Sequence, residues 1–590
     1  MKTSTIQRQI IEGLRAKAQA SWKAGRPDEA ERLYAELLTH DRTDAAALEA
    51  LGHIAVFRGD EAGARKLFER AVKAEPNRLS AQVNLADVLH QAGEDAAALK
   101  LAQRVLIRKP DNALAHFLVG DIAWNGGDFD VAIASLERAA DLSSDLAWHI
   151  KNLMFERLDR CDWRGHDAQV AYFENRLRAG KPNGELSLPL VLLDSPADLL
   201  QGAKTYAEDR YPAKPGLWTG QVWGHERIRI GYVTGEANSH AVGAAIAGVL
   251  EHHDHKAFEI HAFSHGADDR SPIRDRIVAS LDRFVDVSGL DDLAAARLML
   301  ESEIDIAVTL SGYTRAARPG ILAHRPAPAQ VSYLGFPCTM GTPCIDYLIA
   351  DGEVIPPGDE GFYSETIVRL PDCYHPTDDK AQIAARAPTR AEAGLPPDGF
   401  VFMAYGQTVK ITPKLFGTWM RILKRAEGSV LWLTDKGPQA CENLRREAAA
   451  QGVDPARLVF ADRAEDRADH LARHALADLY LDTLPYNAHS SATDALWAGL
   501  PVLTCRGATF PSRVGASMLK AAGLPDLITD TLADYEDLAA ALAGDKPRLA
   551  AIGAQVAGPV RASALFDTAR YTRSLEAALR AIHERARPGP

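Results

Sequence analysis

Apolar positions in the first quarter of the chain recur at the spacing of amphipathic helices, and glycines interrupt that pattern every 34 residues. These turn glycines are Gly25, Gly59, Gly93 and Gly127. Pro76 and Pro110 close two of the predicted helices at the same interval. A helix–turn–helix period of 34 residues is typical of tetratricopeptide repeats. We therefore predict an α superhelical tetratricopeptide repeat array over residues 1–145.

A repeat array of this kind has a concave groove, because each repeat buries its apolar face only against its neighbours, and such grooves commonly hold a polypeptide. Asn84 falls where the groove is expected to be lined, so its amide is a candidate for hydrogen-bonding a bound peptide. A solvated polar residue of a helix is the alternative. The acidic "DFD" at 128–130 stands at a repeat turn, where we expect helix capping rather than metal binding.

After residue 222 the pattern changes to short β-rich runs that alternate with helical segments, as in "RIRIGYVTG" and "SVLWLT". Strands that alternate with helices indicate parallel βαβ units. We predict two doubly wound α/β (Rossmann-like) lobes. The predicted parts are a helical linker at 146–222, an N-terminal lobe at 223–390, a C-terminal lobe at 391–560 and a C-terminal helix at 561–590.

Composition and charge exclude several classes of protein. The formal net charge is −12, so no overall basic field favours nucleic acid as a partner. No apolar stretch approaches the roughly 20 residues that a membrane span needs, and the first residues lack the apolar core of a secretory signal. Six scattered cysteines without a C-x-x-C pair predict reduced thiols and a cytoplasmic location.

Ligands of doubly wound sheets bind beyond the carboxyl ends of the strands. Neither lobe contains the glycine-rich dinucleotide motif or a P-loop, so a phosphate site must be built another way. Three predicted strand ends in the C-terminal lobe are followed by cations, hydroxyls or amides. The candidates are Gln407 and Lys410 after the first strand, Arg467, His470 and Arg473 after the third, and His489, Ser490 and Ser491 after the fourth.

The stretch "YNAHSSATDALWAGLP" at 486–501 places His489, Ser490, Ser491 and Asp494 at a helix start. One interpretation is helix capping by a serine, which is a preferred N-cap residue. The other is an anion bound by the free amides of the first turn. We expect one serine to cap the helix while the amides face a bound anion.

The N-terminal lobe offers fewer candidates. His240 lies just past the first predicted strand, where it is either a proton acceptor or a structural residue at a helix start. The segment 333–351 is rich in Gly, Pro and Thr and is predicted as a loop, in which Thr339 and Gly341 suit close approach of the backbone to a substrate. "EHHDH" at 251–255 lacks further ligands from separate segments, so no metal is expected.

The chain resembles the O-linked N-acetylglucosamine transferase family, in which tetratricopeptide repeats precede a two-lobed glycosyltransferase. The stretches that carry the resemblance are 229–240, 311–351, 405–433 and 477–517. The resemblance implies lobes of GT-B type, a nucleotide-sugar donor bound by the C-terminal lobe at 391–560, and no metal cofactor. It also implies a role for each matched residue: Lys410 and Gln407 at the diphosphate, His470 and Arg473 near the uracil, His489 to Ser491 as the diphosphate cradle, Asp494 at the ribose, and His240 as candidate base.

Three departures from the family pattern surround the expected donor pocket: "SHA" at 239–241, "GFPCTMG" at 335–341, and Arg467 where the family commonly has lysine. They leave open whether the donor is UDP-GlcNAc or another sugar nucleotide. A bacterial subgroup of this architecture glycosylates flagellin with nonulosonic acids from cytidylyl donors. Flagellin and a CMP-linked donor are therefore the alternative acceptor and donor.

The expected function is inverting, metal-independent transfer of a sugar to Ser or Thr of a protein held by the repeats. An inactive transferase that serves as a binding scaffold is one alternative, although the presence of Lys410, His489 and Gln407 argues against it. Another alternative is a transferase that acts on a small molecule or a lipid-linked sugar. That reading gives the repeat array no role.

Overall fold

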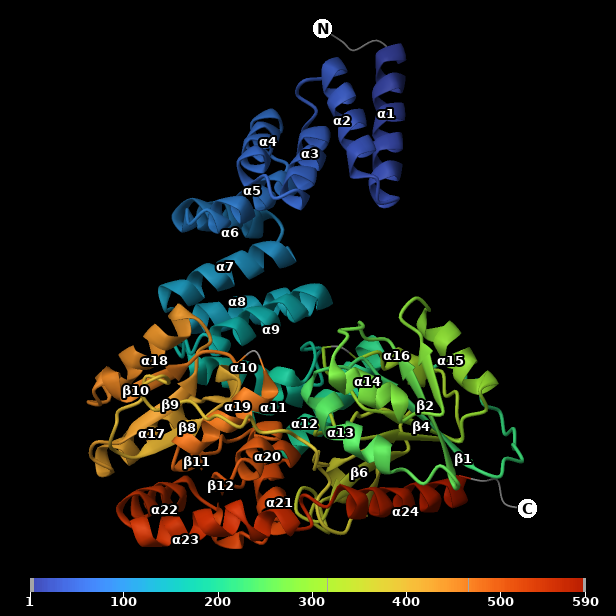
Figure 1. Ribbon diagram of the computed structural model, residues 1–590. Helices are drawn as coiled ribbons and strands as arrows, with labels where there is room; N and C mark the ends of the chain where they lie inside the picture. Colours follow the sequence, from blue (N-terminus) through green and yellow to red (C-terminus); the bar gives the residue numbers. More distant parts are fainter. Residues whose placement is uncertain (1–4, 316, 465, 587–590) are drawn as a thin grey trace. The chain divides into compact units, whose positions relative to one another are not determined.

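The computed structural model describes residues 5–315, 317–464 and 466–586. Contacts within the chain divide it into two compact units (Figure 1). The first unit is Met1–Ile150 with Asp167–Tyr172, and the second is Lys151–His166 with Phe173–Pro590. We describe each unit by itself.

The first unit consists of helices that pack as successive antiparallel pairs, drawn from blue to cyan in Figure 1. Its helices are α1 (Thr5–Lys23), α2 (Pro27–His40), α3 (Ala45–Phe57), α4 (Glu61–Ala74), α5 (Leu79–Gln91), α6 (Asp95–Arg108), α7 (Ala113–Gly126) and α8 (Phe129–Leu142). Inside the pairs the backbones approach closely, since a Cβ on Gly52 would lie 2.5 Å from Phe68 and one on Gly120 2.7 Å from Leu136. Asp128 caps α8 by accepting from the Val131 amide, which confirms the capping role expected of "DFD".

The turn between the helices of each pair depends on the repeated glycine. Gly25, Gly59, Gly93 and Gly127 all have φ between +71° and +84°, the left-handed region in which a side chain is strained. The 34-residue glycine period is therefore a requirement of the turn, and it explains why the repeats were visible in the sequence.

A histidine links three helices of the array. His90 at the end of α5 contacts Asp95 of α6 through Nδ1 (2.7 Å) and Asp121 of α7 through Nε2 (2.9 Å). These hydrogen bonds, chiefly the one to Asp121, raise the pKa of His90 to about 9. Because both ring nitrogens face carboxylates, the doubly protonated ring satisfies the two contacts at once.

The stability of the repeat array is expected to fall at alkaline pH. The folded pKa of His90, about 9, exceeds the ordinary value near 6.5. The resulting stabilisation, on the order of 2–3 kcal/mol, is complete below about pH 6.5 and is lost as the pH rises through 9. Thermal unfolding followed by circular dichroism between pH 6 and 10 tests this. His90→Gln should remove most of the difference between the two ends of that range, and an equal pH dependence in the variant would contradict the assignment.

The second unit begins with helices in the range predicted as a helical linker. These are the last residues of α9 (Ser144–Asp159), most of α10 (His166–Arg178), α11 (Ser187–Leu192) and α12 (Pro196–Arg210). Asp159 accepts a hydrogen bond from Thr408 (2.8 Å), and Trp163 packs on Phe416. Asp159 and Trp163, which precede both lobes in the chain, therefore contact the first part of the C-terminal lobe.

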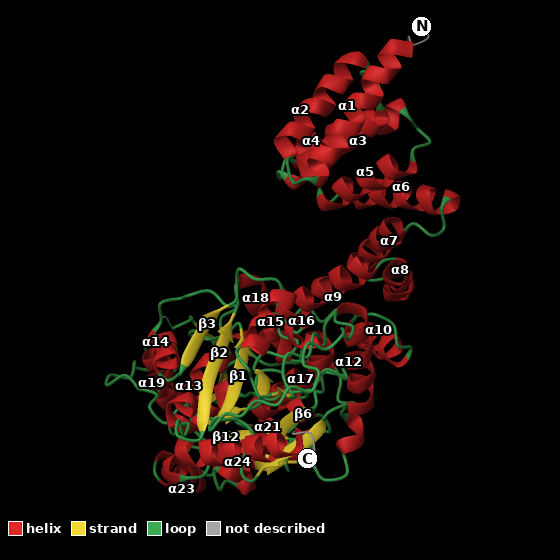
Figure 2. Ribbon diagram, turned by 90° about the vertical axis from the view of Figure 1, so that its right-hand side faces the viewer, coloured by secondary structure: helices red, strands yellow, loops and turns green. Residues whose placement is uncertain are grey.

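The N-terminal lobe is a parallel sheet in the order β3-β2-β1-β4-β5-β6-β7. Its strands are β1 (Ile228–Thr234), β2 (Phe258–Ser264), β3 (Arg283–Asp286), β4 (Ile306–Thr309), β5 (Ala329–Ser332), β6 (Tyr347–Asp351) and β7 (Thr366–Leu370). Figure 2 shows β1 to β3 side by side. The helices are α13 (Ala241–His252), α14 (Pro272–Ala279), α15 (Asp292–Glu301) and α16 (Gly320–Ala323).

The C-terminal lobe repeats this arrangement in the order β10-β9-β8-β11-β12-β13, and all its pairs are parallel. Its strands are β8 (Val401–Ala404), β9 (Val430–Thr434), β10 (Leu458–Ala461), β11 (Leu479–Leu481), β12 (Val502–Cys505) and β13 (Ile528–Thr529). Its helices are α17 (Pro413–Arg425), α18 (Pro438–Ala450), α19 (Arg467–Ala472), α20 (Ser490–Trp497), α21 (Val514–Ala521), α22 (Leu532–Gly544) and α23 (Lys546–Ala557). The predicted repeats and two doubly wound lobes are confirmed.

The segment 333–351 is predicted as loop throughout, but its end forms β6, which pairs with both β5 and β7. The C-terminal helix α24 (Thr568–Ala586) does not stay with the lobe that precedes it. Its apolar side chains Tyr571, Leu575, Leu579 and Ile582 belong to the core of the N-terminal lobe.

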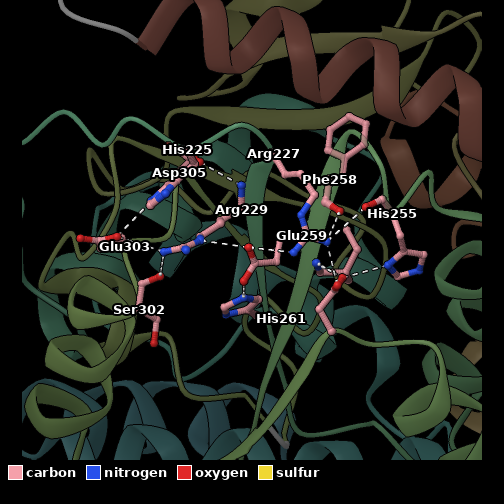
Figure 3. A network of polar contacts seen from close by, with 12 residues as sticks. His225, Arg227, Arg229, His255, Phe258, Glu259, His261, Ser302, Glu303 and Asp305 are labelled. Atoms are coloured by element: carbon pink, nitrogen blue, oxygen red, sulfur yellow. Dashed lines mark hydrogen bonds and ion pairs between the residues drawn. The ribbon is translucent and has the colours of Figure 1, made fainter.

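The amino ends of β1 and β2 carry a network of ion pairs on the side of the sheet away from the strand ends expected to bind ligand (Figure 3). Arg229 contacts Glu259 (3.2 Å) and Glu303 (3.0 Å), and Arg227 contacts Glu259 (3.1 Å) and Asp282 (2.8 Å). Because each carboxylate faces a guanidinium, the network satisfies charged groups along neighbouring strands. The network thus links the amino ends of β1 and β2 to the residues that precede β3 and β4.

Candidate active site

The strand order of the C-terminal lobe reverses between β8 and β11, which is where doubly wound sheets bind their ligands. The chain leaves β8 through a short 3-10 helix, Thr408–Lys410, and leaves β11 through the loop that leads to α20. Lys410 Nζ donates to the Asn487 carbonyl at 3.1 Å and so joins the two exits. A small cavity opens beside this contact. It is lined by Tyr405, Gln407, Lys410, Thr483 and Ser491, among others.

Lys410 is half-buried, and loss of solvent lowers its pKa to about 8, a change that Asp482 opposes. Its ammonium also lies 4.0 Å from the centroid of the Tyr486 ring. The lysine therefore faces a carbonyl and an aromatic ring, with no carboxylate bonded to it in the described part of the chain. A cation without a paired carboxylate is free to neutralise an incoming anion.

Helix α20 begins differently from the expectation that a serine caps it, which was wrong. His489 is the N-cap and makes no side-chain capping bond, while Ser490 and Ser491 are the first two helical residues. The His489 carbonyl already accepts from the Ala492 and Thr493 amides. Among the described residues the amides of Ser490 and Ser491 have no acceptor, so they are available to a bound anion.

Buried Asp482 at the end of β11 shapes the loop that carries these groups. Its carboxylate accepts from the amides of Thr483 (2.7 Å) and Ala488 (2.6 Å) and from the Thr504 hydroxyl (2.6 Å). Burial raises the pKa of Asp482 to about 6 despite these bonds. Sequence reasoning missed this residue, although a carboxylate that ends an apolar strand was a usable signal.

A second small cavity lies between the lobes and is lined by Arg467, Ser490 and Asp494 together with Ala241 and His375. Arg467 Nη2 donates to Asp494 Oδ1 at 2.8 Å. This ion pair joins the exit of β10 to the first turns of α20, as the sequence-based convergence of strand ends requires. Burial raises the pKa of Asp494, and Arg467 opposes that change.

The remaining candidates in the C-terminal lobe lie around these cavities. His470 is half-buried with Nε2 3.9 Å from Asp494, and burial lowers its pKa to about 4, so the ring is neutral at physiological pH. Arg473 donates to the Asp462 carbonyl at 2.7 Å. Gln407 is exposed at the mouth of the first cavity. Their donor contacts stay predictions.

His240 in the N-terminal lobe caps α13: its Nδ1 accepts from the Val242 amide at 3.3 Å. An amide can only donate, so Nδ1 carries no proton and the neutral ring holds its proton on Nε2. The exposed side chain can therefore accept a proton from a substrate only after this cap opens. Its role as a base stays a prediction.

The two predicted substrate-loop residues, Thr339 and Gly341, contact other segments of the protein. Buried Thr339 donates to Glu365 at 2.7 Å. Gly341 has φ +62°, and a Cβ there would lie 2.4 Å from the backbone of Ala203 and Lys204. The close approach that required glycine is thus to α12, and neither residue lines the two cavities described above.

Two aromatic residues beside the site were missed in the sequence. Tyr486 stacks on His489 with ring centroids 4.9 Å apart and an interplanar angle of 26°. His375, which is 5% exposed, lies with its ring centroid 6.3 Å from that of His489. Both histidines have pKa values lowered by burial and are neutral. Tyr486 follows the fourth predicted strand of the C-terminal lobe but carries no charge that would single it out, and His375 lies between the two predicted series of strands.

Asn84 and the histidines of the segment 251–255 have partners within the protein. Asn84 Nδ2 lies 3.1 Å from Glu49 Oε1 and 3.1 Å from His53 Nε2, so its donor side is already engaged. His253 contacts Tyr232 and Glu576. Within the described ranges no group of three or more His, Cys, Asp or Glu side chains is arranged to hold a metal ion.

Comparison with known proteins identifies the family of the chain. The model of glycosyl transferase family 41 matches residues 218–386 and 377–575. The chain belongs to glycosyl transferase family 41. A tetratricopeptide repeat model matches residues 49–113 and 96–147. The recognised family and the glycosyltransferase class are therefore confirmed.

Relatives in family 41 include named peptide N-acetylglucosaminyltransferases. The Arabidopsis thaliana protein "Probable UDP-N-acetylglucosamine--peptide N-acetylglucosaminyltransferase SEC" is 38% identical over 368 residues, which cover 61% of this chain and 38% of that protein. The rice SPINDLY protein is 32% identical over 367 residues (60% and 39%). The Caenorhabditis elegans enzyme is 26% identical over 476 residues (62% and 41%). The match thus spans about two fifths of the length of these curated relatives.

A solved structure extends the likeness over the whole chain. A mutant of the Thermobaculum terrenum O-GlcNAc transferase superposes with a TM-score of 0.63 and 28% identity, and the match covers 99% of each chain. This family 41 chain therefore shares the combination of repeats and two lobes with that protein. In the part that the structure describes, no helix has the length and apolar character to cross a membrane.

Proposed function

We propose that this protein transfers a sugar from a nucleoside-diphosphate sugar to Ser or Thr of a polypeptide, with UDP-N-acetylglucosamine as the donor. The observation that carries the proposal is that Lys410, which is bonded to no carboxylate among the described residues, lines one cavity with Ser491 at the switch point of the C-terminal sheet, where the first amides of α20 have no acceptor. Membership of family 41 and the printed names of the relatives support the choice of donor.

The chemical step needs positive charge where the leaving group gains negative charge. A Ser or Thr oxygen forms a bond to the anomeric carbon while the bond from that carbon to the diphosphate breaks, with inversion. Lys410 and the amides at the start of α20 are fixed before the reaction, so they stabilise the departing diphosphate without reorganising. We infer that these groups take the place that a metal ion has in other transferases.

The hydroxyl proton must leave in the same step. Two acceptors are available: His240, once its bond to the Val242 amide opens, and an oxygen of the departing phosphate. We expect Asp494, which pairs with Arg467, to contact the ribose, and His470 with Arg473 to contact the base, because the family resemblance implies these roles. The repeat array would hold the acceptor polypeptide.

The buried, unpaired state of all six cysteines agrees with a reducing, cytoplasmic location, which we include in the proposal. Flagellin with a CMP-linked nonulosonic acid donor is the alternative within the family. Because the same loop and helix start would face a single phosphate in that case, nucleotide binding distinguishes the two donors.

Titration calorimetry is expected to show tight binding of UDP and weak or no binding of CMP, unaffected by EDTA. The second phosphate of UDP gives Lys410 and the α20 amides an additional charged partner. Transfer from UDP-N-acetylglucosamine to protein in a lysate of the source cells should follow, also without added metal. Preference for CMP would favour the nonulosonic acid donor, loss of transfer in EDTA would refute metal independence, and no turnover with any donor would favour a scaffold.

A further inference from the structure

The loop between β11 and α20 places one aromatic ring against two groups of the site. The Tyr486 ring centroid lies 4.0 Å from Lys410 Nζ, and the same ring stacks on the His489 imidazole at 4.9 Å. An ammonium over an aromatic face is attracted to the negative centre of that face. Tyr486 thus contacts both the cation of the site and the residue that starts α20.

The backbone on both sides of Tyr486 is firmly held. Its carbonyl accepts from the Thr483 hydroxyl at 2.6 Å. The fully buried Asn487 next to it donates through Nδ2 to the Thr483 carbonyl (2.7 Å) and accepts through Oδ1 from the Gly515 amide (3.2 Å). The backbone that carries the ring is therefore held in place, and the ring itself stacks on His489, so the Lys410 ammonium meets a defined aromatic face on this side.

Lys410 receives two contacts from consecutive residues of this loop: the ring of Tyr486 and the carbonyl of Asn487. Neither contact is a carboxylate, so neither cancels the charge. Both favour the protonated amine, because a carbonyl and a π face attract a cation. Burial acts in the opposite direction and lowers the lysine pKa to about 8.

We propose that Tyr486 is a positioning residue of the transferase site, whose ring holds the Lys410 ammonium charged and aimed at the donor diphosphate. The proposal rests on the proposed function for the identity of the anion. The contact between the ring and the ammonium, however, exists in the protein without ligand. It can therefore be tested separately from the reaction.

The first experiment needs no substrate. Lysines are reductively methylated with ¹³C, and the Lys410 signal is assigned by its loss in Lys410→Arg. In Tyr486→Leu the Lys410 pKa is expected to fall by about half to one unit, because the favourable face is gone. Tyr486→Phe keeps the ring and should stay close to the original value. An unchanged pKa in Tyr486→Leu, or an equal fall in Tyr486→Phe, would overturn the proposal.

The second experiment measures UDP affinity by calorimetry. Tyr486→Leu is expected to weaken UDP about three- to eightfold at pH 8.5 and to move the alkaline loss of affinity to lower pH, since less of the lysine is charged. In a Lys410→Met background the same substitution should change the affinity less than twofold, because the ring acts through the lysine. An equal loss in both backgrounds would show that Tyr486 has a merely structural role.

A matched control is available in the same lobe. The guanidinium of Arg445 lies 4.8 Å from the centroid of the Phe460 ring in β10, and neither residue lines the two cavities. Phe460→Leu removes an aromatic–cation contact of the same kind and should leave UDP affinity and the Lys410 pKa unchanged. If wild type fails to bind any nucleotide, the proposed function fails, whereas the pKa experiment still decides the role of Tyr486.

Discussion

Replacing Lys410 with methionine is expected to lower kcat for sugar transfer by about 10²–10³, the usual effect of removing one fixed group that stabilises developing charge. The methionine side chain is similar in length and apolar, so the loop that packs on it has no reason to collapse. The ammonium that joins the exits of β8 and β11 would be lost. The diphosphate would then depart against uncompensated negative charge, with only the α20 amides to accept it.

The matched control is Lys424→Met, which alters an exposed lysine in the last turn of α17. That variant should keep wild-type kcat. Initial rates at saturating donor, together with circular dichroism, separate loss of chemistry from loss of fold. A folded Lys410→Met protein that retained more than a tenth of wild-type kcat would refute the role assigned to this lysine.

Replacing Glu353 with leucine is expected to lower the free energy of unfolding by about 3–5 kcal/mol, as for other buried charge networks that lose one member. Glu353 follows β6 in the N-terminal lobe, and its side chain is 8% exposed. It contacts Arg506 (3.0 Å), Arg513 (3.3 Å) and Lys520, all from the C-terminal lobe. Without the carboxylate these three cations of the C-terminal lobe repel one another and lose their shared partner in the N-terminal lobe.

Differential scanning calorimetry at neutral pH measures this change, and we expect a lower Tm. The control is Glu392→Gln, which breaks an exposed pair with Arg386 and should cost less than about 1 kcal/mol. Burial raises the pKa of Glu353, but Lys520 and Arg506 lower it further than burial raises it. The stabilisation is therefore present above the ordinary carboxyl pKa and lost as the pH falls through the lowered value. Equal Tm values for wild type and Glu353→Leu would contradict the assignment.

The sequence predicted those parts of the fold whose causes are local. The repeat glycines are periodic because each must adopt a positive φ, and that need leaves a mark at every turn. The strands of the C-terminal lobe are short apolar runs between helices, so their positions were recognised. The strand ends that carry Lys410 and Ser490 followed from the general rule for doubly wound sheets.

Features set by distant packing were not predictable in this way. Strand β6 was read as loop because prolines, glycines and cysteines precede it, and only its pairing with β5 and β7 identifies it. His489 rather than a serine is the N-cap of α20 because Asp482 and Asn487 shape the preceding loop. The contact of Tyr486 with Lys410 joins residues 76 positions apart, so no local pattern announces it.

The course of α24 determines the order in which the lobes can be completed during synthesis. The side chains of Tyr571, Leu575, Leu579 and Ile582 finish the core of a lobe whose strands were translated some two hundred residues earlier. The Tyr571 hydroxyl also meets Tyr333 and the Tyr374 carbonyl there. The N-terminal lobe must therefore wait, with part of its apolar surface uncovered, until α24 has been translated and has left the ribosome.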